Sequence, residues 1–360
     1  MNIEAALAVA EAYKEAELLI LARITAAVRA GLSAPDFEVT TLARLQRLRA
    51  DSVAALAGAN RLAGLIITSS VQQAYAEGSA AALSQLGELI DPIGIASLQQ
   101  RAAVQLVVGE MVDGITGMQT DVLRQVDDTF RRVVSKTVAS TLARGETRKA
   151  AAQRAITQFY GQGLKTFPDR GGRAWKMADY ANMAVRTGTR QAQIQGHEAV
   201  MEVNGLDLVV VHPGPRACPI CDKWARAVLS RSGQSGTITT TNVRTGKPMK
   251  VKVGGTLAEA RAANFQHPNC RCTLRAYLPG ATDPDVIERP EWDESGYEAQ
   301  QKQRELEVAV REAKLKQATA LDPKFAKQQA EQVREAQKAI RAHLDENTTL
   351  KRQYGREQVQ

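Results

Sequence analysis

The chain has 360 residues, of which 44% are hydrophobic and only 4% aromatic, and its formal net charge is +8. This length can bury one large core or two medium cores, and the composition excludes a chain that is disordered throughout. Ala, Gln, Arg and Glu are abundant. Because these side chains lose little rotamer freedom in a helix, we expect long helices rather than a β-sandwich or a compact pocket enzyme.

The amino-terminal segment carries glutamates where a secretion signal would carry Lys or Arg, and it lacks a clean apolar core ending in small residues. We therefore expect no export signal. No stretch approaches the roughly 18 uncharged apolar residues that span a bilayer, and the best candidate, 62–71, is far too short. The sequence predicts a soluble protein that is made in the cytoplasm.

Apolar periodicity predicts a helix over 3–28, which ends at Gly31. A second helix is expected over 39–56, where nearly heptad spacing suits a bundle helix better than an intermolecular seam. Further helices are suggested at about 62–90 and 95–115, although glycines blur their boundaries.

The middle of the chain has a clearer pattern. A four-residue apolar interval over 122–142 predicts one continuous helix ending near Gly145. A basic helix is expected over 146–160, a Pro- and Gly-rich loop over 166–175, and another helix over 176–199.

Charge is distributed unevenly along the chain. Residues 1–130 contain 9 Lys and Arg against 15 Asp and Glu, residues 131–190 contain 13 against 3, and residues 191–360 contain 25 against 21. The basic middle block could meet phosphates, whose counterions it would release, or an acidic protein face. A merely solvated helix face is an equally weighted alternative. The basic residues singled out for contact are Arg131, Arg132, Lys136, Arg144, Arg148, Lys149 and Arg154.

The pattern changes to strands after residue 200. LDLVVVH at 206–212 is a short β-branched run, and the segments 237–243 and 249–253 alternate on either side of RTGKP, which predicts a hairpin. Beyond the linker that begins at Pro279, residues 296–345 are charged and helix-forming, with a break at 321–323. Their apolar positions are too sparse to form a core alone.

All four cysteines lie within 55 residues, and His267 stands three positions before Cys270. Two pairs of candidate ligands each flank a proline-led turn: Cys218 with Cys221, and His267 with Cys270. This geometry brings two ligands toward one ion. We predict a structural, tetrahedral zinc site in which Cys272 is a further candidate ligand. Such a site would replace the apolar core that a module of about 80 residues is too small to build.

Some ligand assignments stay open. The Cys-Pro-Ile-Cys pair is the firmest, His267, Cys270 and Cys272 compete for the two remaining places, and His212 is a spare donor. The separation of about 45 residues between the pairs is longer than in common zinc fingers. Disulfides are an alternative, disfavoured because the absence of an export signal indicates a reducing compartment, and unpaired buried thiols are another.

A metal-dependent nuclease of the His-Asn-His type is the enzyme that this cluster could support, and it would need a histidine base and a second metal. His212 is the one histidine near the module outside the proline-led turns, and a lone histidine is more often structural. The sequence has no Walker loop, Rossmann fingerprint, zincin motif or nucleophile elbow. We therefore predict no catalytic residue, with a non-catalytic DNA-binding protein as the other alternative.

The segments HPGPRACPICDKWARAVLSRSGQSG (212–236) and FQHPNCRCTLRAYLPG (265–280) resemble the phage minor capsid protein type 2 family, within the wider Mu F-like head morphogenesis group. That family is similar in its His-Pro-Gly-x-Arg segment, its Cys-x-x-Cys-x-x-Trp continuation and its closing Cys-Arg-Cys or Cys-Arg-His. Residues 173–196 and 350–358 resemble the family's helix before the module and its carboxy-terminal ending. Many relatives have Gly-Lys where this chain has Arg226-Ala227.

The resemblance covers roughly residues 120–360. It implies a virion component present in few copies, assembled in the host cytoplasm and bound inside the head near the portal vertex. It also implies roles in head assembly and in DNA packaging or ejection, with no established catalysis. The implied partners are the portal protein, the major capsid protein and packaged double-stranded DNA, and no membrane is involved.

We therefore expect a mainly α protein: a long helical amino-terminal region, a small α+β Cys/His module of the zinc type and a charged helical tail. The predicted segments are a helical amino-terminal region (1–120), a basic helical region (121–199), the Cys/His module (200–280), and a linker with the charged tail (281–360).

Overall fold

The computed structural model describes residues 3–32, 41–87, 89, 93–94, 96–144, 147–162, 167–168, 174–214, 217–268, 270–288, 293–318, 320 and 323–358. The helices are α1 (Ile3–Leu32), α2 (Thr41–Leu86), α3 (Ser97–Thr116), α4 (Gln119–Arg144), α5 (Arg148–Gln162), α6 (Met177–Val203), α7 (Pro219–Asp222), α8 (Leu257–Ala262), α9 (Glu294–Ala318), α10 (Pro323–Glu346) and α11 (Tyr354–Glu357), with a 3-10 turn at Pro284–Val286. The strands are β1 (Phe167–Pro168), β2 (Ala174–Trp175), β3 (Leu208–His212), β4 (Val228–Ser230), β5 (Gly236–Thr241), β6 (Pro248–Val253), β7 (Gly255–Thr256) and β8 (Thr273–Ala276).

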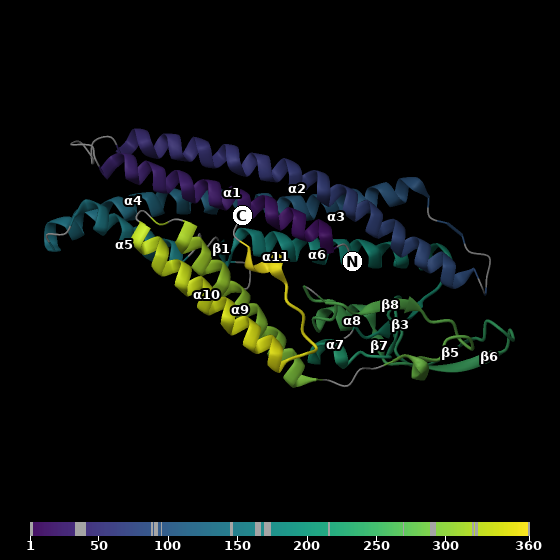
Figure 1. Cartoon of the computed structure of the whole chain (residues 1–360). Helices are drawn as coiled ribbons and strands as arrows, with labels where there is room; N and C mark the ends of the chain where they lie inside the picture. The colour runs from purple at the N-terminus through teal and green to yellow at the C-terminus, as the bar shows by residue number, and fades with distance from the viewer. Residues whose placement is uncertain are drawn as a thin grey trace. The chain divides into compact units, whose positions relative to one another are not determined.

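Long helices, a small set of strands after residue 200 and a helical carboxy-terminal segment confirm the predicted fold class (Figure 1). The helices expected over 3–28, 95–115, 122–142 and 176–199 are present, with ends within a few residues of those predicted. The break expected at 321–323 separates α9 from α10.

Two expectations about the elements were wrong. The two expected helices 39–56 and 62–90 are replaced over 41–86 by the single helix α2, since Leu56, Ala59 and Ala63 are buried through the expected gap and keep its apolar face continuous. The expected loop at 166–175 contains the antiparallel strands β1 and β2, in which Phe167 faces Trp175. Period and turn composition could not predict a pairing of only two residues on each side.

By length and composition, one described helix could cross a membrane. The segment Ala43–Leu86 of α2 contains a window with a mean hydropathy of 1.2, of which 28% is buried inside the protein. This differs from the expectation for the sequence, because α2 continues without a break on both sides of 62–71. A single helix of this kind is a weak indication, since core helices also reach these values.

The described residues divide into two compact units. The first unit contains 1–7, 64–113 and 182–293, and the second unit contains 8–63, 114–181 and 294–360. The helices α1, α2, α3 and α6 each contribute residues to both units.

In the first unit, α2 and α6 pack closely at two glycines. A Cβ atom on Gly78 would lie 1.9 Å from the carbonyl oxygen of Gln193, and one on Gly196 would lie 2.1 Å from the carbonyl oxygen of Tyr75. Both distances would overlap backbone atoms, so only glycine allows this approach. At this close approach the Ser79 hydroxyl of α2 donates to the Gly196 carbonyl of α6 at 3.2 Å.

The first unit also contains a four-stranded sheet with the order β7-β4-β3-β8. Strand β3 is antiparallel to both β4 and β8, while β4 and β7 are parallel. Val209 and Val211 of β3 pack into a core that includes Leu86 of α2, while Val210 packs on the opposite face with Val251 of the β5–β6 hairpin. Because successive strand residues face opposite sides, the uninterrupted apolar run of β3 indicates a strand buried on both faces.

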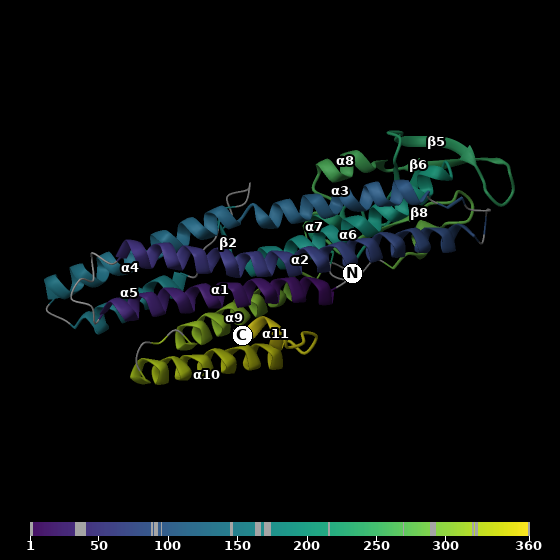
Figure 2. The ribbon, with the colours of Figure 1, turned by 90° about the horizontal axis from the view of Figure 1, so that it is seen from above.

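The second unit ends in a helical pair with few apolar side chains. Helices α9 and α10 lie side by side in both views (Figures 1 and 2), and the imidazole of His343 near the end of α10 donates to the carbonyl of Ala299 near the start of α9. The pair is therefore antiparallel.

A network of buried charges closes this helical pair. Arg352 donates twice to Glu357 of α11, at 2.6 and 2.7 Å, and the Glu357 side chain is almost fully buried. Arg356 reaches Glu307 of α9 at 3.4 Å, and the Gln303 amide donates to the same carboxylate. Charges of both signs thus occupy positions where a larger helix pair would have apolar side chains.

Candidate metal centre

Two backbone turns present the ligand candidates of the Cys/His module. Cys218 directly precedes α7, whose first residue is Pro219, and the Asp222 amide donates to the Cys218 carbonyl at 2.9 Å. In the second turn, the Cys270 amide donates to the His267 carbonyl at 2.9 Å. The first closure brings the sulfurs of Cys218 and Cys221 into one donor group, whereas His267 and Cys270 of the second turn belong to different groups.

The structure brings all five predicted ligands together. The sulfur of Cys218 lies 3.0 Å from Nε2 of His267, and the sulfur of Cys221 lies 3.4 Å from that of Cys270. The donor atoms form two overlapping groups that share Cys221, one with Cys218 and His267 and one with Cys270 and Cys272, and within each group they lie within 4.8 Å of one another. Ligands of a tetrahedral zinc ion are about 3.5–3.8 Å apart, so the donors are already near the required spacing.

The His267 ring has the tautomer that a metal ligand needs. Its Nδ1 lies 2.8 Å from the carbonyl oxygen of Pro268. A carbonyl can only accept, so Nδ1 carries a proton, and Nε2, the atom that faces Cys218, is the ring nitrogen left to bind a metal once it is deprotonated.

The thiols strongly perturb one another. Hydrogen bonds to Cys270 and Cys272, together with burial, raise the pKa of Cys221, whereas hydrogen bonds from Cys221 and Cys272 lower the pKa of Cys270. For Cys218, burial opposes the thiolate, but hydrogen bonds from the Cys221 backbone and from His267 lower its pKa. Such a crowded set of sulfurs can lose several protons only if a cation is present.

The His-Pro-Gly segment has a structural role that its sequence did not reveal. A Cβ atom on Gly214 would lie 2.8 Å from the carbonyl carbon of Arg271, so glycine permits this close approach. The Gly214 amide donates to the sulfur of Cys272 at 3.4 Å. Arg190 of α6 donates to the carbonyls of Arg271 and Cys272. Gly214 and Arg190, neither predicted as a site residue, therefore position the closing Cys-Arg-Cys segment.

The donors fit a structural metal ion. The four cysteines, all of them described, are free thiols, and Cys221, Cys270 and Cys272 are buried. Cys221, Cys270, Cys272 and His267 could hold a metal with the ligand types that zinc prefers. The described donors supply more than four candidates.

The spare donor His212 does not join this cluster. It ends β3 opposite Thr273 and belongs to neither donor group. Burial and then the charge of Arg275 lower the pKa of His212.

The basic residues predicted for contact lie on two helices of the second unit that pack against each other, α4 and α5. The exposed side chains are those of Arg131, Arg132, Lys136, Lys149 and Arg154. The side chains of Arg144 and Arg148 lie outside the described residues. Lysines and arginines are thus displayed on a protein surface, and Arg132 also donates to the Asp128 carbonyl within α4.

Arg226, at the position where the sequence resemblance leads us to expect glycine, has a left-handed backbone conformation with φ of 65°. Its amide donates to the Val211 carbonyl, which fixes the connection between β3 and β4. A side chain in this conformation is strained, so the backbone itself accounts for glycine at this position.

Comparisons with curated proteins and with solved structures gave no match. A family model, that of phage minor capsid protein 2, matches residues 4–345, which is nearly the whole chain. The match includes both proline-led turns, the Gly214 contact and the helices on either side of the module. With this agreement along its length, the chain belongs to the phage minor capsid protein 2 family.

Proposed function

We propose that this minor capsid protein docks inside the phage head at the portal vertex, where it supports head assembly and DNA packaging or ejection. Membership of the family, which makes the chain a virion component that associates with other virion proteins, supports the proposal. The observation that carries it is the pair of ligand turns, which would tie the 218–221 turn and the 267–270 turn of a small docking module to each other. Portal and major capsid proteins are the proposed partners.

In this proposal a structural zinc ion is held by Cys218, Cys221, His267 and Cys270. These four belong to the two turns that are closed by backbone hydrogen bonds, which fixes each pair before the ion arrives. Cys272 is a further candidate ligand, because it shares a donor group with Cys221 and Cys270 and the Gly214 amide favours its thiolate. When bound, zinc would supply cohesion to the fold and no chemistry.

A structural role is consistent with the minor capsid family. The nuclease alternative gains no support from the geometry, because His212, its proposed base, stands apart from the donor groups. We propose instead that the exposed basic residues of α4 and α5 contact packaged DNA or an acidic portal surface.

Purified phage particles test the location. Mass spectrometry should find the chain in few copies, and cryo-imaging of particles with a tagged copy should place it at one vertex. Cys221→Ser should reduce its incorporation, while Thr237→Ser, an exposed change on β5, should not. Uniform distribution over the shell, or absence from particles, would contradict the proposal.

A salt titration tests the basic surface. Binding of purified protein to random duplex DNA and to purified portal should be measured from low to moderate salt. Replacing Arg131, Arg132 and Lys136 by Gln should reduce the salt slope for the true partner by up to about three, and the matched change Lys250→Gln should not. Unchanged slopes for both partners would assign these residues to a solvated face.

A further inference from the structure

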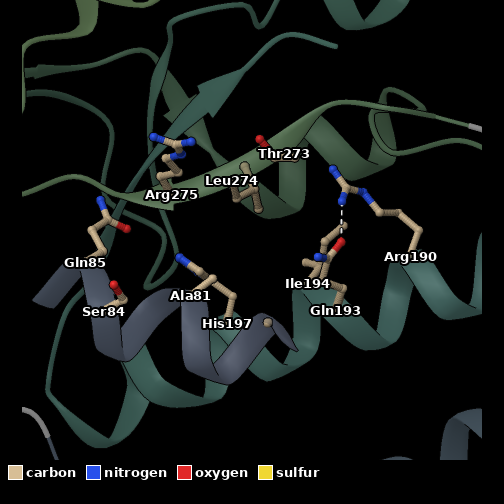
Figure 3. A pocket seen from close by; sticks show the side chains of 11 residues that line it. Ala81, Ser84, Gln85, Arg190, Gln193, Ile194, His197, Thr273, Leu274 and Arg275 are labelled. Carbon is tan, nitrogen blue, oxygen red and sulfur yellow. Dashed lines mark hydrogen bonds between the residues drawn. The ribbon is translucent and has the colours of Figure 1, made fainter. Parts of the chain in front are cut away.

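The first unit contains a cavity of about 590 Å³ outside the metal centre. Its walls come from α2, α6 and β8, and Figure 3 shows the two helices on one side and the strand on the other. This volume suits a few residues of an extended chain or a small molecule.

Three residues of strand β8, namely Thr273, Leu274 and Arg275, line this cavity. It is an edge strand, because β3 is its single neighbour in the described sheet. The Tyr277 amide donates to the Leu208 carbonyl, so in this antiparallel register Arg275 and Thr273 also exchange hydrogen bonds with β3. The N–H and C=O groups of the residues between them, including Leu274, therefore point away from β3.

Side chains from the helices already occupy both ends of this edge. Gln85 of α2 places its amide against Ala276, where Nε2 donates to the carbonyl and Oε1 accepts from the N–H, just as a neighbouring strand would. At the other end Arg190 donates to the Cys272 carbonyl. Leu274 lies between these two contacts and is one of the residues that line the cavity.

The N–H and the C=O of Leu274 offer one donor and one acceptor, which a peptide group of another strand can pair with. A phosphate offers acceptors and could satisfy the N–H alone, whereas an extended peptide offers both partners at strand spacing. The contact of Gln85 with Ala276 shows that this edge accepts an amide from outside the sheet.

The charges of the cavity favour an acidic ligand. Arg190 and Arg275 are among the described lining residues, and none of these residues is acidic. No ion pair of Arg275 is found within the described part of the chain. Figure 3 places Arg275 and Arg190 at opposite ends of the lining segment of β8.

Two buried polar atoms in the lining lack a partner in the protein. His197 is 7% exposed and its Nδ1 makes no hydrogen bond, and the same holds for Nε of Arg190. Both atoms belong to residues that line the cavity, although the atoms themselves are buried.

We propose that the edge of β8 at Leu274 is a docking site for an extended, acidic peptide segment of a partner protein. The segment would add as a strand over Leu274, displacing the Gln85 side chain as far as its length requires, and its carboxylates would lie between Arg190 and Arg275. This inference does not depend on the location at the portal vertex.

Peptides of matched length test the proposal on the full-length, metal-loaded chain. The probes are acetyl-Glu-Val-Glu-Val-amide, its lysine counterpart acetyl-Lys-Val-Lys-Val-amide, and the acidic peptide with N-methylated central amides. Binding is measured by calorimetry and by the amide resonance of Leu274 in a chain labelled with ¹⁵N-leucine. The acidic peptide should shift the Leu274 resonance, and N-methylation should weaken its binding about tenfold or more.

A charge variant with a matched control separates this edge from general attraction to a basic protein. Arg275→Glu should weaken binding of the acidic peptide about fivefold, and Arg244→Glu, an exposed change in the same unit outside the cavity, should leave it within about twofold. Melting curves check that both variants fold.

Several outcomes would overturn the proposal. These are equal binding of the N-methylated peptide, equal binding of the lysine peptide, or no shift of the Leu274 resonance at millimolar acidic peptide. Inorganic phosphate that displaces the acidic peptide and produces the same Leu274 shift would assign the cavity to a small anion instead.

Discussion

The Cys/His module of the first unit and the α9–α11 segment of the second unit each contain a polar cluster, but the module also has apolar cores on both faces of β3, whereas few apolar side chains of α9–α11 are buried. In the module the converging groups are all electron-pair donors, four thiols and an imidazole. In α9–α11 the cluster contains positive and negative charges: Arg352 pairs with Glu357, and Arg356 pairs with Glu307. A set of donors alone needs a cation from outside, whereas a set of paired charges is complete in itself.

Removing the metal should separate the two regions most strongly. With a chelator, or in Cys221→Ser, the module should lose about 5 kcal/mol or more of stability, because the converging thiols then repel or must be protonated. Amide hydrogen exchange should accelerate in β3, β4 and β8 and stay unchanged in α9 and α10. Elemental analysis of the wild-type protein should give one zinc per chain, and its absence would remove the basis of the comparison.

The next largest effect is expected in α9–α11. Glu357→Gln leaves the Arg352 charge without its bidentate partner in a buried network and should cost about 3 kcal/mol, measured by denaturant unfolding. The matched change Glu305→Gln removes an exposed pair with Lys302 and should cost less than about 0.5 kcal/mol. Neither variant should change the zinc content, and a loss of zinc in Glu357→Gln would contradict the separation of the two regions.

Acid should affect the two units in opposite directions. Burial, and then the charges of Arg275 and Arg231, lower the pKa of His197 in the first unit from 6.5 to about 4. Between these values the unfolded chain binds more protons, so this contribution is present above pH 6.5 and is lost as the pH falls toward 4. It amounts to up to about 3 kcal/mol. The pH dependence of unfolding should be shallower in His197→Gln than in wild type.

Glu307 in the second unit changes the stability in the opposite direction as the pH falls. Burial raises the pKa of its carboxyl group above 4.5 despite the Arg356 charge. The folded state therefore binds the extra proton, and this group's contribution to stability increases as the pH falls through the raised pKa. Glu307→Gln should remove that gain, and a gain that persists would assign it to another group.

The smallest expected effect comes from the backbone of the module and involves no ion. Arg226→Gly should stabilise the protein by up to about 1 kcal/mol, because relief of the left-handed strain exceeds the entropy that glycine adds to the unfolded chain. Thermal melting of the metal-loaded protein measures this change. A lower melting temperature would show that the Arg226 side chain contributes more than its backbone strain costs.

Local pattern predicted much of this molecule. The four-residue interval of α4 and the break before α10 need only side-chain periodicity and proline geometry, which act over one or two turns. The β5–β6 hairpin was predicted for the same reason, because its strands are close in sequence. The continuity of α2 was missed because glycines in a helix weaken local propensity while burial of Ala59 and Ala63 restores the helix.

For the candidate site, the sequence by itself determined the donor types and their grouping in two turns, since a Cys-Pro-x-Cys spacing fixes a pair of ligands without reference to the rest of the chain. Only the tertiary structure decided that the two turns meet, that Gly214 and Arg190 hold the closing segment, and that β8 is left with a free edge between Gln85 and Arg190. These features join residues that are tens to more than a hundred positions apart. Such contacts depend on the packing of whole elements, and one-dimensional spacing contains no information about it.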